Sequence, residues 1–324
     1  MKWNLQPDSA ARQYGARLML AQLTVLHAES AGAEAGADLE CIHRMRVASR
    51  RLRAVLMYFN QILPRSVRQQ FEEQARGITQ ALGSSRDLDI QLQAVRRFQL
   101  MREPGTGING LEELQARLET QRQQSGEEVR ALTHLFQESP AVARVEEYLT
   151  ELAAQPDTPP STPLRLLAGQ AVHSRLTKLL SFTEVMRDPT QIEQLHAMRI
   201  AAKRLRYTLE IFTALDAGGF KPWLKRVRGA QETLGAIHDC DVWEALLSPH
   251  ANAGRGLPAG IQLWRENRAN QRARLFADFI RGWDAPAPGS GWEELQLQLQ
   301  KSQPAESTRQ AALYKSEAAQ GAAK

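Results

Sequence analysis

Two stretches of the sequence carry the same row of basic side chains. Residues 41–59 read CIHRMRVASRRLRAVLMYF and residues 194–212 read QLHAMRIAAKRLRYTLEIF, and their histidines are 153 positions apart (196 − 43). Guanidinium groups donate paired hydrogen bonds that match the geometry of phosphate oxygens. A repeated row that is mostly arginine therefore predicts binding of an anion. The row consists of His43, Arg46, Arg50 and Arg53 in the first copy and His196, Arg199, Lys203 and Arg206 in the second.

Helical geometry gathers each row on one side of a helix. At about 100° per residue, the four basic positions of a copy fall within an arc of about 80°, along about 15 Å of axis. Arg51 and Arg204 lie at the flank of this arc. The opposite side is apolar, and it consists of Met45, Leu52, Leu56 and Phe59 in the first copy and Met198, Leu205, Leu209 and Phe212 in the second. We expect the apolar side to face a core and the basic side to face a ligand.

The positive charge of the chain is concentrated in these two rows. Residues 43–53 contain five Lys or Arg, residues 196–206 contain four, and neither stretch contains Asp or Glu. The rest of the chain has 32 basic residues (41 − 9) against 36 acidic ones. A patch of one sign indicates a partner of the opposite sign. The competing interpretation, a solvated face balanced by acidic neighbours, fits a single basic run better than a repeated one.

The two histidines have two possible roles. A histidine beside a phosphate becomes a charged donor at mildly acidic pH, because its ordinary pKa is about 6.5. Alternatively, His43 and His196 orient a neighbouring helix. Both roles stay open.

The chain is expected to be helical throughout. Apolar residues recur at helical spacing over 8–29, 39–62, 65–82, 86–102, 110–137, 140–154, 164–184, 190–214, 220–235, 239–248 and 258–282. The prolines of QPDTPPSTP, residues 155–163, cannot continue a helix. We therefore expect a first repeat over 1–154, a linker over 155–163, a second repeat over 164–302, and a mobile tail over 303–324 that is rich in Ala, Gln and Ser.

The duplication extends beyond the basic rows. GITQALGSSRDLDI at 77–90 matches GAQETLGAIHDCDV at 229–242. We expect Gly83 and Gly235 to end a helix in the left-handed conformation. The aspartates that follow would then favour the start of the next helix; they are Asp87, Asp89, Asp239 and Asp241. Short connections predict antiparallel neighbours, and hence an all-α fold of two similar antiparallel bundles.

Composition adds an expectation about the compartment. Only Cys41 and Cys240 are present, far apart in the sequence, which favours a reducing cytoplasm over a disulfide scaffold. No apolar run approaches the 18 or so residues of a membrane span, and the first residues lack the pattern of a signal peptide.

The doubled signature H-x-x-R-x-x-x-[RK]-R-x-R, together with the two Leu-Gly…Asp segments, resembles the CHAD family, the conserved histidine α-helical domain. The resemblance extends over about residues 8–282. It implies two similar helical bundles related by approximate two-fold symmetry, in a stand-alone form. It also implies that inorganic polyphosphate binds along a basic groove or pore between the repeats, and that the protein is located at cytoplasmic polyphosphate granules with other granule proteins as further partners.

The resemblance also implies a set of ligand-facing residues. Carried over position by position, this set is the basic row of each copy, with Arg51 and Arg204 at its flank. Weaker candidates lie outside the rows, and they are Arg17, Arg76, Arg175, Lys178 and Arg228. We expect a non-catalytic binding protein with no catalytic residue, metal ligand or cofactor. The sequence does not indicate an oligomeric state.

A metal phosphohydrolase is one alternative function. His196 and the pair His238-Asp239 faintly resemble the histidine and aspartate ligands of such enzymes. The first copy argues against it, because Arg86-Asp87 stands where the second copy has His238-Asp239. Arginine does not bind a metal ion.

A nucleic-acid-binding protein is the other alternative. A basic helix can enter the major groove, and its binding would depend on salt in the same way. However, the basic face offers no set of Asn or Gln side chains to read bases and no aromatic platform for stacking. We therefore expect polyphosphate rather than nucleic acid as the partner.

Overall fold

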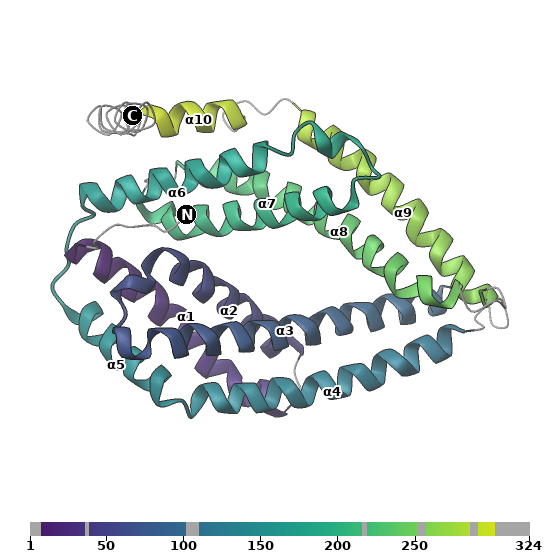
Figure 1. Cartoon of the computed structure of the whole chain (residues 1–324), viewed down its shortest axis with the longest axis horizontal. Helices are drawn as coiled ribbons and strands as arrows, with labels where there is room; N and C mark the ends of the chain where they lie inside the picture. Colours follow the sequence, from purple (N-terminus) through teal and green to yellow (C-terminus); the bar gives the residue numbers. More distant parts are fainter. Residues whose placement is uncertain are drawn as a thin grey trace, which may run out of the picture. The chain divides into compact units, whose positions relative to one another are not determined.

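The computed structural model describes residues 8–35, 39–101, 110–215, 219–251, 257–285 and 291–301. Within these ranges the chain forms ten α-helices and three short 3-10 helices, with no strand (Figure 1). The α-helices are α1 (Ser9–Ala35), α2 (Leu39–Phe59), α3 (Arg65–Leu100), α4 (Leu111–Gln137), α5 (Pro140–Ala154), α6 (Thr162–Leu180), α7 (Ile192–Phe212), α8 (Lys221–Ala251), α9 (Ala259–Asp284) and α10 (Trp292–Lys301). The expected all-α class is confirmed. The tail expected to be mobile, residues 303–324, lies outside the described ranges.

None of the helices in the described ranges is long and apolar enough to cross a membrane.

The prediction that Gly83 and Gly235 end helices is wrong. Both lie inside helices, since α3 runs unbroken from Arg65 to Leu100 and α8 from Lys221 to Ala251. Among the described glycines, positive φ occurs at Gly110, which precedes α4 with φ 85°. A glycine inside a helix costs only about 0.5–1 kcal/mol relative to alanine, which the packing of flanking apolar residues outweighs.

The same correction applies to the aspartates that follow these glycines. Asp87 and Asp89 lie in the middle of α3, and Asp239 and Asp241 lie in the middle of α8. None of the four is near the N-terminus of its helix, so the helix dipole does not explain their positions.

The chain divides into two compact units. Unit 1 comprises Met1–Ser161 and Ala236–Ala277, and unit 2 comprises Thr162–Gly235 and Asp278–Lys324. Helices α8 and α9 each contribute to both units. This division differs from that of the sequence repeats, because parts of α8 and α9 cluster with α1–α5.

In unit 1, α2 packs against α1 and α3, and α3 runs alongside α4 (Figure 1). The four apolar residues predicted to face the core are buried, with relative exposures of 1% for Met45, 0% for Leu52, 6% for Leu56 and 1% for Phe59. This packing fixes the rotation of α2 about its axis. The basic side of the helix is therefore held away from the core.

A second apolar cluster in unit 1 joins the ends of four helices. Side chains of α3 and α4 pack there against the parts of α8 and α9 that belong to this unit. The indole ring of Trp264 lies edge-on to Phe98 and Trp243, with ring centroids 4.7 and 5.1 Å away. Residues from the second half of the sequence thus complete the core of unit 1.

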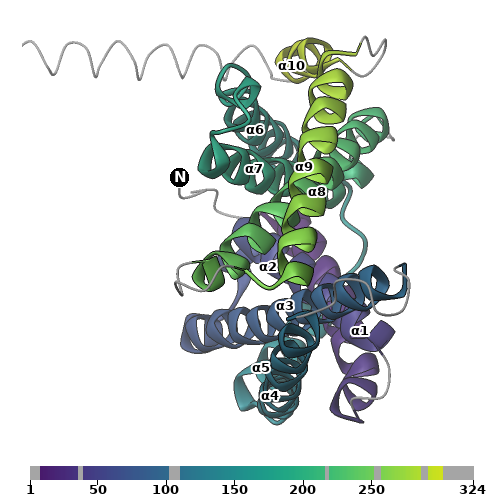
Figure 2. The ribbon, with the colours of Figure 1, turned by 90° about the vertical axis from the view of Figure 1, so that its right-hand side faces the viewer.

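In unit 2, α7 lies beside α6 (Figure 2), and α10 also contacts α6. The predicted core residues of α7 are fully buried, with 0% exposure for Met198, Leu205, Leu209 and Phe212. Helix α10 was not expected from the sequence. Its start is stabilised by the carboxylate of Glu294, which accepts a hydrogen bond of 2.9 Å from the backbone N–H of Gly291.

Candidate functional site

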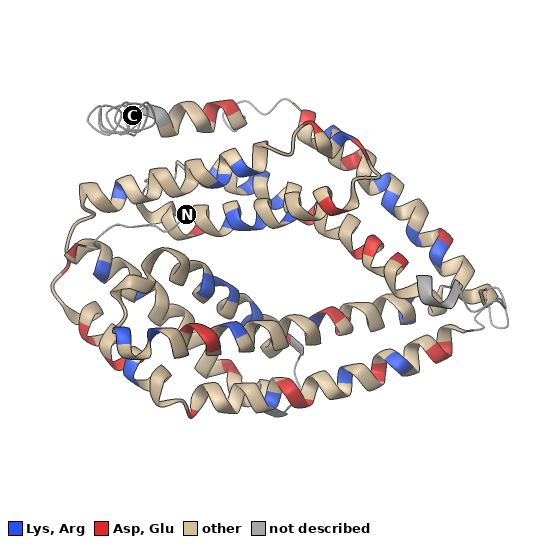
Figure 3. Cartoon of the chain, in the orientation of Figure 1, with Lys and Arg blue, Asp and Glu red and all other residues tan. Residues whose placement is uncertain are grey.

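Helix α2 carries the first basic row on the side opposite its core contacts. His43, Arg46 and Arg50 are partly buried and Arg53 is exposed. Figure 3 marks the Lys and Arg residues along this helix and, separately, along α7. The flanking Arg51 is also exposed.

Helix α3 extends the positive surface of the first row. A Cβ atom added to Gly83 would lie 3.9 Å from Nη2 of Arg50, so the guanidinium group of Arg50 lies over this buried glycine. The charge of Arg76 on α3 lowers the pKa of Arg53, and the charge of Arg86 on α3 lowers the pKa of His43. Arg86 is not among the predicted site residues; its signal in the sequence is that the matched positions Arg86 and His238 both carry a basic side chain.

The cations of this surface repel one another. Partial burial lowers the pKa of Arg53, and the charges of Arg76 and Arg50 lower that pKa further. Within the part of the chain that the structure describes, Arg50, Arg53 and Arg76 have no carboxylate at ion-pair distance. A bound anion would relieve this repulsion, which makes the surface of α2 and α3 a candidate anion site.

The same surroundings disfavour the protonated form of His43. Its pKa is lowered first by burial and then by the charge of Arg46, with smaller contributions of the same sign from Arg86 and Arg44, while Glu40 opposes them. Its Nδ1 atom is buried and has no hydrogen-bond partner among the described residues. An anion beside His43 would oppose this shift, because a neighbouring negative charge favours the protonated imidazole.

The second basic row lies on α7. His196, Arg199, Lys203 and Arg206 are partly buried, and the flanking Arg204 is exposed. As in the first row, an arginine lies over a glycine of the following helix: a Cβ atom on Gly235 would be 3.8 Å from Nε of Arg199. Gly235, which was predicted to end a helix, thus lies against an arginine of the row.

One acidic residue distinguishes the second row from the first. The carboxylate of Glu210 lies 3.8 Å from Nε of Arg206 and 3.1 Å from Nη2 of Arg228. The guanidinium group of Arg206 also lies 4.8 Å from the ring centroid of Tyr207. This end of the second row is therefore partly neutralised within the protein.

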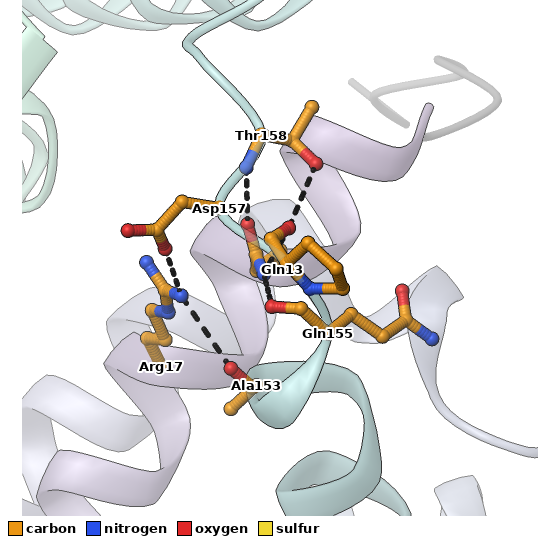
Figure 4. Close-up of polar contacts among 7 residues, drawn as sticks. Gln13, Arg17, Ala153, Gln155, Asp157 and Thr158 are labelled. Carbon is orange, nitrogen blue, oxygen red and sulfur yellow. Dashed lines mark hydrogen bonds and ion pairs between the residues drawn. The ribbon is translucent and has the colours of Figure 1, made fainter.

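Arg17 lies on α1 beside the linker. It forms an ion pair with Asp157 and donates a hydrogen bond of 3.4 Å to the carbonyl of Ala153 (Figure 4). The neighbouring Gln13 donates to the carbonyl of Gln155 at 2.6 Å and accepts from the N–H of Thr158 at 3.0 Å. The contacts of Arg17 therefore tie the linker to α1.

The two remaining candidates, Arg175 and Lys178, lie on α6. The ammonium group of Lys178 is 4.5 Å from the ring centroid of Phe182. Arg175 is partly buried.

Two aspartates of the repeated Leu-Gly…Asp segments form matching ion pairs. Asp89 of α3 binds Nε of Arg122 of α4 at 2.5 Å, and Asp241 of α8 binds Nε of Arg272 of α9 at 2.5 Å. The aspartate side chains are only 8% and 10% exposed. Each carboxylate therefore links its helix to the following helix through an ion pair. In the described residues, no three His, Cys, Asp or Glu side chains are grouped so that they could hold a metal ion.

Both the sequence and the fold are similar to those of known proteins. A family model described as the CHAD domain matches residues 17–248. The crystal structure of the CHAD domain from the plant Ricinus communis has a TM-score of 0.60 and 25% sequence identity, covering 89% of this chain and 96% of that one. PptA from Streptomyces chartreusis has a similar fold, with a TM-score of 0.56 at 18% identity over 85% of this chain and 99% of that one. No curated protein matches the sequence.

Proposed function

Because this chain belongs to the CHAD family, we propose that its two basic rows bind inorganic polyphosphate and that the protein is a non-catalytic binding module. The observation that supports this most is the surface of α2 and α3, where Arg50, Arg53 and Arg76 have no carboxylate at ion-pair distance in the described residues. A linear polymer of phosphates supplies closely spaced anions to such a row.

The affinity would come from charge-assisted hydrogen bonds and from the release of counterions. Neither depends on the chemical nature of the polymer's ends. We expect a long chain to bind to the rows of α2 and α7 together and a short one to bind to a single row. The second contact is then intramolecular, which raises the overall affinity by about 10²–10⁴.

The experiment that tests this function is a chain-length series. Polyphosphates from pyrophosphate to long polymers, with ATP as a compact phosphate ligand, are titrated by isothermal calorimetry at two or more salt concentrations. We expect long polymers to bind at least about 100-fold tighter than pyrophosphate or ATP, with affinity falling steeply as salt rises. Equal affinities across the series would contradict binding to two rows.

A DNA duplex of matched charge separates this function from nucleic-acid binding. In competition at fixed salt, polyphosphate should displace the duplex while the duplex should not displace polyphosphate. The reverse result would favour the nucleic-acid interpretation, which predicts the same salt dependence.

The histidine of the first row makes binding depend on pH. A neighbouring phosphate raises the pKa of His43 from its lowered value, so that binding takes up a proton and tightens as the pH falls. We expect the affinity to rise between about pH 7.5 and 5.5 in the natural protein and to rise less in His43→Gln. The phosphate groups of the ligand titrate in the same way with both proteins, so their effect on the affinity cancels in this comparison. Identical pH profiles would assign His43 a purely structural role.

The unbound protein should show the opposite trend in stability. The lowered pKa of His43 means that the unfolded chain binds a proton more readily than the folded protein does. The contribution of His43 to the free energy of unfolding should therefore decrease as the pH falls through the ordinary histidine value of about 6.5.

The proposed ligand also implies a location at polyphosphate granules. A fluorescent fusion should coincide with stained granules in cells that accumulate the polymer. It should become diffuse in cells that lack polyphosphate.

A further inference from the structure

The ends of the two basic rows differ at one matched position. In the second row, Glu210 lies between Arg206 and Arg228. The offset of 153 relates Arg206 and Glu210 to Arg53 and Met57 (206 − 153 and 210 − 153), and the offset of 152 in the following helix relates Arg228 to Arg76 (228 − 152). The first copy thus has the same two arginines, but a methionine where the second has a carboxylate.

In the second copy the carboxylate bridges the two arginines. Glu210 is 3.8 Å from Arg206 and 3.1 Å from Arg228, and its side chain is only 15% exposed. The side chain of Arg206 is 21% exposed and that of Arg228 is 47% exposed. An external anion would compete with Glu210 for both guanidinium groups.

In the first copy the corresponding place is a cavity. It has a volume of about 160 Å³ and is lined by Arg53, Leu56, Met57, Asn60, Glu72 and Arg76. At about 30 Å³ for each water molecule of the liquid, it has room for about five, which is enough for a phosphate group. Met57, which stands at the position of Glu210, lines this cavity, and its side chain is 37% exposed.

The acidic residue that lines this cavity, Glu72, is hydrogen-bonded to a second lining residue. The carboxylate of Glu72 accepts a hydrogen bond of 2.8 Å from the side-chain amide of Asn60. Among the described residues it forms no ion pair with Arg53 or Arg76. Burial lowers the pKa of Arg53, and the charges of Arg76 and Arg50 lower it further, so these arginines repel one another even with Glu72 in the same lining.

We propose that Arg53 and Arg76 form a phosphate-binding subsite, and that in the second copy the carboxylate of Glu210 occupies the matching position. This inference rests on the proposed polyphosphate function and makes the two rows unequal. The first row contributes more to the free energy of binding. The second row contributes less, because Glu210 occupies its matching position.

Exchanging the two side chains tests the proposal. Met57→Glu places a carboxylate between Arg53 and Arg76 and should weaken the binding of long-chain polyphosphate by about tenfold or more, the equivalent of one lost charged hydrogen bond. Glu210→Met frees Arg206 and Arg228 and should strengthen binding by about the same factor. The slope of log affinity against log salt should become shallower by about one in Met57→Glu and steeper by about one in Glu210→Met.

Two control variants carry the same change of charge at exposed positions. Leu135→Glu on α4 matches Met57→Glu, and Glu293→Met on α10 matches Glu210→Met. Because these positions lie outside the rows, the controls should change the affinity less than twofold or so. Thermal unfolding of all four variants checks that each is folded.

A second pair of variants avoids burying a new charge. Arg53→Gln should weaken binding by about tenfold, whereas Arg206→Gln should have a smaller effect, because Arg206 already binds Glu210. Equal effects of these two substitutions, with exchange variants that bind like their controls, would refute the unequal subsites and leave the polyphosphate function intact. If the natural protein binds no polyphosphate, the proposed function itself fails.

Discussion

The double variant Arg50→Glu, Lys203→Glu is expected to lose polyphosphate binding while it keeps its helices. The two residues occupy matched positions in the middle of the two rows (203 − 50 = 153). Each is only partly buried, and Arg50 lies over Gly83 rather than in the apolar core. Each charged hydrogen bond lost costs about 1.5–3 kcal/mol, so two together reduce the affinity by at least about 100-fold, before repulsion by the new carboxylates is counted.

Calorimetric titration with long-chain polyphosphate measures the loss, and far-ultraviolet circular dichroism measures the helices. The matched control is Arg130→Glu, Lys221→Glu, which changes the net charge by the same amount at exposed positions of α4 and α8. If the control loses as much affinity as the double variant, binding depends on overall charge and not on the rows. Retention of natural affinity in the double variant would contradict the proposed function directly.

The sequence could predict the rows because the helix repeat determines which side of α2 and α7 is apolar. Eight large apolar residues at helical spacing are buried as expected, Leu52 and Leu205 among them. When the apolar side is buried against the core, the basic side must face away from it. The rotation of each helix, and with it the place of each row, thus follows from local pattern alone.

The surroundings of the rows could not be predicted in this way. Glu210 binds Arg228 of another helix, and a contact between helices depends on packing that no single periodicity encodes. Gly83 and Gly235 carry the usual signal of a helix end, yet the packing of α3 and α8 continues through both. Their closeness to Arg50 and Arg199 is visible only when two helices are placed together.

For the same reason, the sequence could not predict which segments make up unit 1. Trp243 and Trp264 lie more than 130 residues from Phe98 in the sequence, yet they share its apolar cluster. The amphipathic pattern of a helix predicts that its aromatic residues are buried, but it does not predict which residues they contact. The assignment of residues 236–277 to unit 1 therefore required coordinates.

The ion pairs of α3 with α4 and of α8 with α9 give the largest stability prediction. Asp241→Asn is expected to lower the free energy of unfolding by about 3–5 kcal/mol, because it removes the carboxylate charge that lies against the largely buried guanidinium group of Arg272. Arg272 is 19% exposed and Asp241 is 10% exposed. The same change at Asp89, which faces Arg122 with nearly the same exposures, should cost a similar amount. Urea unfolding followed by circular dichroism measures both.

An exposed pair provides the control for this loss. Asp278 and Arg281 form an ion pair within α9 whose side chains are 57% and 77% exposed, so Asp278→Asn should cost less than about 1 kcal/mol. Replacing both members of a buried pair, as in Asp89→Leu with Arg122→Met, should recover much of the stability that Asp89→Asn loses, because no buried charge is left unpaired. If the double replacement is as unstable as the single one, these aspartates stabilise the helices through something other than their arginines.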